Sequence, residues 1–379
     1  MDLTFSDEEE AFRAEARAWL ETNVPPEPLP SGDTAAGFAR HLEWERRLFD
    51  ARWAVVSWPR EYGGRDASLW GWLVFEEEYY RAGAPQRVTQ NGIFLLAPTL
   101  FEFGTREQQD RILPPMASGE QTWCQGWSEP DAGSDLAAIR SRAVRDEAGG
   151  GWRLSGQKTW TTRGAFCTHL FGLFRTDPEA GRHRGLTYFL VPLDADGVTV
   201  RGFGRLDGDE GFADVFLDGA FVPDHDVLGD VDQGWAVAMA TTGSERGLTL
   251  RSPGRFTATA ARLVDLYRER AETADAGLRD DVIRAWMDAE AYRLQTLSTV
   301  TRLDDGERPG PEASLTKLFW SELDVRMHET ALRLLGPAAE LEDEWTKGYQ
   351  FALAGPIYAG TNEIQRNVVA ERVLGLPRK

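Results

Sequence analysis

The feature that most constrains this chain of 379 residues is a hydrophobic repeat whose period changes twice along the sequence. Residues 1–120 and 231–379 carry apolar side chains at the three- to four-residue spacing of helices. Residues 121–230 instead hold short runs of aromatic and β-branched side chains. Because a chain of this length divides into more than one domain, we predict an α+β, mainly α, fold. It has an N-terminal helical domain, a middle antiparallel β domain and a C-terminal helical bundle.

Helix signals are clear in the first stretch. Ser6 and Glu9 have the spacing of a capping box, in which each side chain binds the other residue's backbone amide. The proline-rich segment 25–30 ends this first helix. Further helices are predicted over residues 68–80 and 106–116.

The middle stretch predicts several short strands. Their apolar runs are residues 170–174, 186–191, 198–200 and 215–217. Asp-Gly pairs, which are typical of tight turns between strands, occur at 196–197, 207–208 and 218–219. We expect a small antiparallel sheet and not a parallel nucleotide-binding one.

Two long amphipathic segments dominate the last stretch. The first places Leu278, Val282, Ala285, Ala289 and Tyr292 on one helix face. The second places Leu315, Phe319, Leu323, Ala331 and Leu334 on another. Long helices joined by short loops indicate a helical bundle.

Composition excludes several kinds of partner. The formal net charge is −19 at pH 7, whereas nucleic-acid binding needs a basic face. No apolar run approaches the length of a membrane span, and the acidic start of the chain lacks the pattern of a signal peptide. Cys124 and Cys167 have neither metal-ligand nor disulfide spacing, and the five histidines are scattered. We therefore predict a cytoplasmic protein with no metal site.

Three polar motifs stand out against this background. The first is Trp123-Cys-Gln-Gly-Trp-Ser-Glu-Pro-Asp-Ala-Gly-Ser-Asp135, the second is Gly156-Gln-Lys-Thr-Trp-Thr-Thr162, and the third is Gly360-Thr-Asn-Glu-Ile-Gln-Arg366. A tryptophan between hydroxyls at a strand end can pack on a planar ring while the hydroxyls bind the ring's edge. Gly360, Thr361 and Asn362 predict a turn and a helix N-cap, where free backbone amides suit a polar cofactor. Taken singly, each motif also fits a plain turn or a core tryptophan.

In this order, the three motifs resemble the acyl-CoA dehydrogenase family, and the order of helices and strands matches along the whole chain. The resemblance implies a flavoprotein that binds FAD and oxidises an acyl-CoA between its α and β carbons. A carboxylate removes the α-proton while the β-carbon gives a hydride to the flavin. An electron-transferring flavoprotein is the implied acceptor. The implied assembly is a homodimer, a homotetramer, or a mixed tetramer with a related subunit.

The same resemblance implies roles for individual residues. Those matching flavin-contacting positions are Gln125, Trp127, Ser128, Trp160, Thr162, Gly360, Thr361 and Glu363. Gly336 resembles a glycine through which a neighbouring subunit reaches the FAD. Ser134 is similar to a serine near the thioester, and Arg246 is similar to an arginine directed toward the CoA end.

The catalytic base departs from the commonest pattern. Many members carry a glutamate immediately before the Gly-Thr of the third motif, where this chain has Ala359, which cannot accept a proton. Members similar to isovaleryl- and long-chain enzymes carry it on a bundle helix, immediately before the CoA-directed arginine. This chain has Glu245 at that position. We therefore expect Glu245 to be the base, with Glu363 as the rival carboxylate.

A second departure lies between Ala260 and Asp281, which lack the Arg-x-x-Phe-Gly segment of many members. Its arginine serves the FAD pyrophosphate of a neighbouring subunit. In this respect the chain resembles a bacterial subgroup in which some mixed assemblies contain a catalytically incomplete subunit. Two alternatives stay open: a flavin monooxygenase or oxidase on the same fold, and a partner subunit that completes another chain's site. The acyl group, and whether CoA or a carrier protein bears it, are also open.

Overall fold

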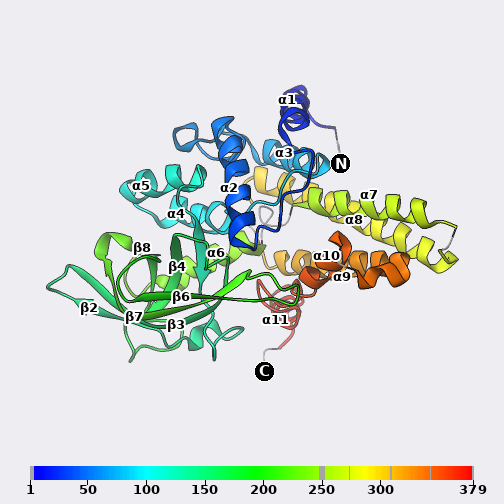
Figure 1. Ribbon diagram of the computed structural model, residues 1–379. Coiled ribbons are helices and arrows are strands. Elements are labelled where there is room, and N and C mark those ends of the chain that lie inside the picture. Colours follow the sequence, from blue (N-terminus) through cyan, green and yellow to red (C-terminus); the bar gives the residue numbers. More distant parts are fainter. Residues whose placement is uncertain (1–3, 247–251, 273, 308–309, 342, 378–379) are drawn as a thin grey trace. The chain divides into compact units, whose positions relative to one another are not determined.

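The computed structural model describes residues 4–246, 252–272, 274–307, 310–341 and 343–377, and only the backbone of residues 244–246. The chain forms two compact units, both assembled from segments that are distant in sequence (Figure 1). The helical unit comprises Met1–Val24, Ala67–Ala84 and Arg246–Lys379. The sheet unit comprises Pro25–Asp66 and Pro85–Glu245. The domain boundaries at residues 120 and 230 stay a prediction.

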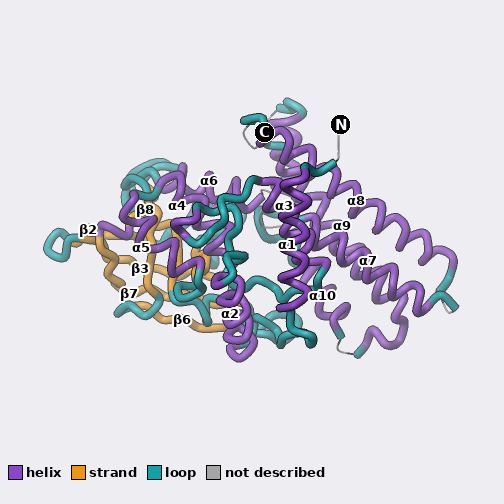
Figure 2. Tube along the Cα trace, turned by 90° about the horizontal axis from the view of Figure 1, so that it is seen from above, coloured by secondary structure: helices purple, strands orange, loops and turns teal. Residues whose placement is uncertain are grey.

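The helical unit is built from long helices that bury one face each. They are α1 (Asp7–Asn23), α3 (Leu69–Arg81), α7 (Pro253–Arg270), α8 (Ala276–Asp304), α9 (Ala313–Leu335), α10 (Glu344–Ala352) and α11 (Asn362–Val368). The predicted capping box is present at the start of α1, between Ser6 and Glu9. Figure 2 shows α7, α8 and α9 side by side. Phe256, Tyr292 and Trp320 form the aromatic centre of their common core.

The predicted core faces of α8 and α9 are largely confirmed. Every member of the α8 set is buried. On α9, Leu323, Ala331 and Leu334 are buried, but Leu315 is 46% exposed, because it lies in the first turn of the helix beyond the core. The opposite face of α8 is also apolar: Ile283, Trp286, Met287 and Leu294 are exposed there.

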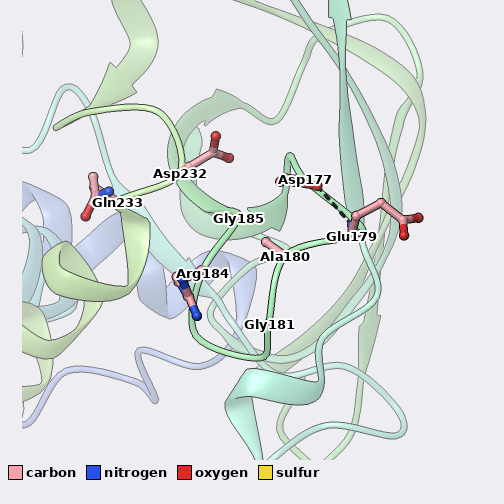
Figure 3. A pocket seen from close by; sticks show the side chains of 8 residues that line it. All are labelled: Asp177, Glu179, Ala180, Gly181, Arg184, Gly185, Asp232 and Gln233. Atoms are coloured by element: carbon pink, nitrogen blue, oxygen red, sulfur yellow. Dashed lines mark hydrogen bonds between the residues drawn. The ribbon is translucent and has the colours of Figure 1, made fainter.

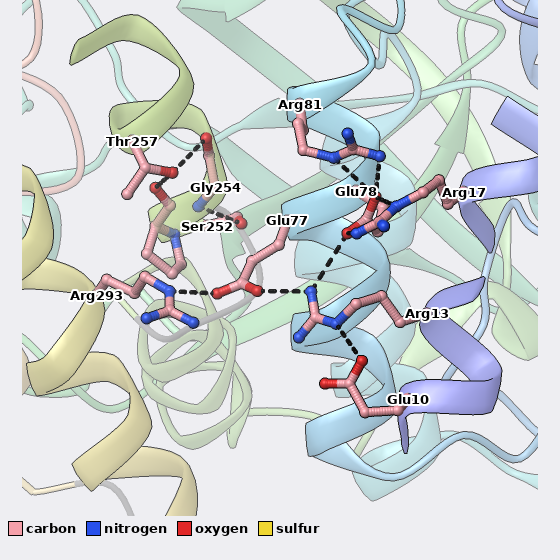
Figure 4. A network of polar contacts seen from close by, with 11 residues as sticks. Glu10, Arg13, Arg17, Glu77, Glu78, Arg81, Ser252, Gly254, Thr257 and Arg293 are labelled. Carbon is pink, nitrogen blue, oxygen red and sulfur yellow. Dashed lines mark hydrogen bonds and ion pairs between the residues drawn. The ribbon is translucent and has the colours of Figure 1, made fainter. Parts of the chain in front are cut away.

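A network of charged side chains fastens α1 to α3 and α3 to α8 (Figure 4). The Arg13 guanidinium donates to Glu77 at 3.0 Å, and the Glu77 carboxylate also accepts from Arg293 at 2.6 Å. Glu78, whose side chain is 2% exposed, accepts hydrogen bonds from both Arg17 and Arg81. Burial by itself would raise the pKa of Glu78, but the two arginines outweigh it and lower this pKa to about 2.

The sheet unit combines helices with a mainly antiparallel sheet. Its helices are α2 (Ala35–Asp50), α4 (Ala97–Phe103), α5 (Arg106–Ala117) and α6 (Gly234–Arg246), with a π-helical segment over Asn91–Leu96 before α4. Its strands are β1 (Trp123–Gly126), β2 (Arg142–Asp146), β3 (Gly151–Thr162), β4 (His169–Arg175), β5 (Leu186–Pro192), β6 (Val198–Phe203), β7 (Phe212–Pro223) and β8 (Val227–Leu228). All four predicted strand runs are confirmed within β4, β5, β6 and β7.

The strands follow the order β6-β7-β3-β2-β4-β5-β8, and β1 pairs with β4. Most pairs are antiparallel, as predicted, but β1 with β4 and β2 with β4 are parallel. These pairs join segments that are not neighbours in sequence, so no turn motif between them predicts the pairing. Cys124, Leu154 and Phe174 lie in the buried core of this sheet.

One predicted turn is wrong. Asp218 and Gly219 do not end a strand, because β7 continues through them to Pro223. In the pairing with β3, Leu154 faces Ala220 and Ser155 faces Asp218, which leaves Gly219 as an extra residue. Gly219 has φ 68°, so it forms a β-bulge, for which glycine in the left-handed region is favoured as it is in a turn.

None of the helices described here is both long and apolar enough to cross a membrane. Within the same described segments, no cluster of histidine, cysteine, aspartate or glutamate side chains could hold a metal ion.

Candidate functional site

The first motif leaves the sheet at the end of β1. Gln125 is half-buried on β1, where it pairs with Phe171 of β4. Trp127 is buried and lies edge-on to Tyr188, and its indole N–H has no protein partner among the described residues. The half-buried Ser128 hydroxyl makes no hydrogen bond to another residue in the described segments. Ser134 follows in an exposed loop.

The second motif contains a β-bulge that turns Trp160 outward. Lys158 pairs with Val215 and Thr161 pairs with Ala213, so Thr159 and Trp160 together oppose a single residue of β7. Trp160 has φ 57°, a strained value for a side chain of this size. Its ring makes T-shaped contacts with Phe203 and Phe212, yet 60% of the residue is exposed.

A backbone hydrogen bond joins these two motifs. The Thr159 amide donates to the Ser128 carbonyl oxygen at 2.9 Å. Thr162, at the end of β3, is half-buried, and its hydroxyl has no hydrogen-bond partner in the described part of the chain. The sheet unit therefore brings together an outward indole and two unpartnered hydroxyls, those of Ser128 and Thr162.

The third motif lies in the helical unit, in the turn that starts α11. Ala359 and Gly360 both adopt left-handed backbone conformations, with φ 56° and 76°. Thr361 caps α11 by accepting from the Ile364 amide at 3.3 Å, as its sequence predicts. The Gln365 side chain donates back to the Ala359 carbonyl at 2.9 Å, which closes the turn.

Glu363 and Gly336 occupy exposed positions in the helical unit. Glu363 is exposed, and hydrogen bonds from its own backbone amide and from Thr361 lower its pKa. A general base that works near neutral pH needs the opposite shift. Gly336 ends α9 with φ 58°, a conformation in which a β-carbon is unfavourable.

The predicted base cannot be placed. Glu245 and Arg246 are the last two residues of α6, and their side chains lie outside what the structure describes. The third motif belongs to a different compact unit from the first two. The structure thus joins the first motif to the second, and describes the third by itself.

Sequence reasoning missed the burial of two lysines, one within the second motif and one that contacts the third. Lys158 ion-pairs with Glu129 at 2.8 Å in the sheet unit. Lys317 of α9 donates to the Asn362 side chain at 2.7 Å in the helical unit. The burial of Lys158 could have been predicted from the alternation of side chains along the strand. Lys158 lies an even number of residues after Trp152 and Leu154, which are buried on one face of β3.

A separate polar cavity of about 470 Å³ lies in the sheet unit, between the β4–β5 loop and the segment before α6 (Figure 3). Its walls are Asp177, Glu179, Ala180, Gly181, Arg184, Gly185, Asp232 and Gln233. None of the predicted site residues lines it.

Known proteins share this architecture along the full chain. The N-terminal, middle and C-terminal domains of acyl-CoA dehydrogenase match residues 6–120, 124–217 and 232–374. Acyl-CoA dehydrogenase IpdE1 of Mycolicibacterium smegmatis is 40% identical over 98% of this chain and 99% of its own. IpdE1 of Mycobacterium tuberculosis is also 40% identical, over 98% of each chain. The chain belongs to the acyl-CoA dehydrogenase family.

Solved structures agree. A structure described as the Tcur3481-Tcur3483 steroid ACAD superposes with a TM-score of 0.89 at 29% identity, covering 100% of both chains. The ChsE4-ChsE5 complex from Mycobacterium tuberculosis gives 0.85, also at 29% identity and 100% coverage of both. The predicted family, fold class, enzyme class and FAD cofactor are therefore confirmed.

The residues present fit FAD. Its isoalloxazine is a planar, polar-edged ring, and the outward Trp160 offers an aromatic face to such a ring. The Ser128 and Thr162 hydroxyls have no protein partners in the described segments, so they are free to bind the edge of the ring. In the helical unit, taken by itself, the capped start of α11 presents backbone amides from Gly360 onward.

Proposed function

We propose that this acyl-CoA dehydrogenase oxidises a thioester whose acyl group is bulky and contains rings, with Glu245 as the proton-abstracting base. The related structure described as a steroid ACAD supports the ring-containing substrate class. The observation that carries the base assignment is the third motif, where Ala359 stands before Gly360 and offers no proton acceptor.

The predicted substrate-side residues then have distinct roles in the reaction. Glu245 removes the α-proton, and Arg246 orients the CoA end of the substrate. Glu363 is a poor rival base because its carboxylate is exposed and its pKa is lowered. Ser134 lies in an exposed loop of the first motif, where it can bind the thioester or pantetheine. When bound, FAD accepts the hydride from the β-carbon.

Trp127, Ser128, Trp160 and Thr162 hold and orient the flavin from the sheet unit. Gln125 of β1 is a further proposed contact in this unit. In the helical unit, the proposed flavin contacts are Gly360 and Thr361 of the turn before α11 and Glu363 in its first turn. Gly336, at the exposed end of α9, faces a neighbouring subunit.

An exposed apolar face of the helical unit indicates where another subunit binds. The exposed face of α8, formed by Ile283, Trp286, Met287 and Leu294, is apolar over three turns. We propose that a second copy, or a related subunit in a mixed tetramer, covers it. Two related structures are complexes with two named components, which favours the mixed tetramer. An electron-transferring flavoprotein is the proposed acceptor.

Anaerobic titration of the purified, flavin-loaded protein with a panel of acyl-CoAs tests this function. The panel contains short straight-chain, branched and polycyclic acyl groups. We expect a ring-containing acyl-CoA to bleach the flavin absorbance without NAD(P)H. Bleaching by NAD(P)H and by no acyl-CoA, with the colour returning when oxygen is admitted, would instead indicate a monooxygenase. Bleaching only after addition of a related subunit would indicate an incomplete partner chain.

A further inference from the structure

The two joined motifs of the sheet unit contain a fully buried lysine. Lys158 of β3 has a side chain with no exposed surface, and its Nζ is 2.8 Å from Oε1 of Glu129, whose side chain is 8% exposed. The same Nζ donates to the Leu173 carbonyl of β4 at 2.7 Å. Burying a charge is costly unless it is paired and hydrogen-bonded, and here both conditions are met.

The Glu129 carboxylate has two further donors. It accepts from the backbone amides of Arg140 at 2.6 Å and Ser141 at 2.9 Å. Glu129 and Ala132 also exchange both of their backbone hydrogen bonds. The carboxylate therefore holds the start and the end of the loop that contains Ser134.

Lys158 connects this loop to the flavin motifs. Its Nζ lies 3.5 Å from the carbonyl oxygen of Trp127, immediately before Ser128. The next residue, Thr159, donates its amide to Ser128, and Trp160 follows in the bulge. The ion pair thus contacts the carbonyl immediately before Ser128 and includes Glu129 immediately after it, and Lys158 lies two residues before Trp160.

We propose that Lys158 and Glu129 are positioning residues: their buried ion pair sets Ser128 and Trp160, which face the flavin, relative to the loop that carries Ser134. This proposal rests on the function proposed above, because it takes Ser128 and Trp160 as flavin contacts. A buried ion pair adds little stability over a neutral pair of similar size, so its contribution here is geometric.

The charge state supports this arrangement. Burial pulls the pKa of Glu129 upward, but the Lys158 charge and hydrogen bonds from the Arg140 amide and from Ser141 outweigh it, so the pKa lies below its ordinary value. The carboxylate is therefore ionised at neutral pH. Burial lowers the pKa of Lys158, and the Glu129 charge opposes that shift.

The test compares Lys158→Met, Glu129→Gln and the double variant. The single variants leave one buried group without its partner and lose stability. The double variant has no unpaired charge, and the side-chain oxygen of the new glutamine still accepts from one backbone amide, so we expect its urea midpoint to return most of the way to that of the parent. We nevertheless expect its FAD dissociation constant to rise about fivefold to tenfold. We also expect the visible circular dichroism of the flavin bound to the double variant to differ from that of the parent.

Another buried pair of the sheet unit provides the matched control. Arg87 and Glu45 have side chains 5% and 2% exposed and lie 3.2 Å apart. We expect Glu45→Gln, Arg87→Met to alter stability but to keep the parent's FAD affinity and flavin dichroism. Recovery of both flavin properties in the Lys158→Met, Glu129→Gln protein would overturn the proposal, since the pair would then be merely structural.

Flavin reduction adds a second readout. In the double variant we expect the rate of reduction by acyl-CoA to fall on the order of 10²-fold, because small misplacements of reacting groups are costly. FAD affinity and dichroism need no substrate. If no acyl-CoA reduces the parent protein, the proposed function fails while the two flavin measurements still decide the positioning role.

Discussion

The backbone amide of Thr159 donates a 2.9 Å hydrogen bond to the carbonyl oxygen of Ser128. This bond attaches the loop after β1 to the bulge in β3, so the Ser128 hydroxyl and the Trp160 indole are held on one piece of the sheet unit. Neither residue lies in a regular part of a strand. The surface proposed to face the flavin is thus made where the sheet departs from regular pairing.

Trp160→Ala is expected to weaken FAD binding. Aromatic packing over a ring contributes on the order of 1 kcal/mol, which corresponds to a severalfold rise in the dissociation constant. Quenching of flavin fluorescence on titration with apoprotein measures it. Trp160→Phe retains most of the affinity, and Val144→Ala, at an exposed apolar position on β2, retains all of it. Equal affinity in the Ala variant would place the flavin elsewhere.

Glu245→Gln is expected to slow flavin reduction by a factor on the order of 10²–10⁴, the range that a general base contributes. FAD content stays at the parent level, because this residue is assigned to the substrate. Stopped-flow absorbance under anaerobic conditions gives the rate, and Glu363→Gln tests the rival carboxylate, which is exposed. A slow Glu363→Gln beside an unimpaired Glu245→Gln would reverse the assignment. In the Glu245→Gln background, Ala359→Glu is expected to restore part of the rate.

Glu78 makes the stability of the helical unit sensitive to acid. Its folded-state pKa is lowered to about 2, so the unfolded chain binds more protons below its ordinary pKa of 4.5. The stabilisation is therefore complete above pH 4.5 and is lost as the pH falls toward 2. Arg17 and Arg81 are half exposed, so screening reduces the contribution to about 1–2 kcal/mol. Glu78→Gln should unfold earlier in urea at pH 7, and this difference should shrink progressively as the pH is lowered.

Asn362→Ala is expected to destabilise the turn of the third motif. The variant removes the acceptor at 2.7 Å from the buried Lys317 and at 3.1 Å from Ser321. Loss of a buried acceptor from a charged donor costs about 2–3 kcal/mol. Urea unfolding measures the change, and Asn367→Ala, at an exposed position, is the control within about 0.5 kcal/mol of the parent. Equal midpoints for the two variants would show that the contact with Lys317 contributes no stability.

Trp286→Lys is expected to reduce the size of the assembly. Trp286 is 49% exposed in the single chain and is one of the four residues of the apolar face of α8. A charge there is buried on association and disfavours it. Light scattering during size-exclusion chromatography reports the mass. Gln295→Lys adds a lysine at an exposed polar position of α8 outside this face and keeps the parent mass. If both variants retain the parent mass, the interface lies on another face.

Much of the fold could be predicted from the sequence because local patterns dictate it. The capping box of Ser6 and Glu9 and the buried face from Leu278 to Tyr292 depend on residues within a few turns of one another. The four strand runs of the middle stretch are confirmed for the same reason. The residues assigned by resemblance to the flavin and substrate stay predictions, and the side chain of Glu245 lies outside the described residues.

Where two distant segments meet, the sequence by itself was insufficient. It determined the elements, their buried faces, the family and the cofactor. Only the tertiary structure decided the parallel pairing of β1 with β4, the bulge at Gly219 and the outward turn of Trp160. It also decided that Lys158 is buried against Glu129. The physical reason is that hydrophobic period and capping are local properties of the chain. Strand register and buried charge depend instead on partners that pairing brings together from far along the sequence.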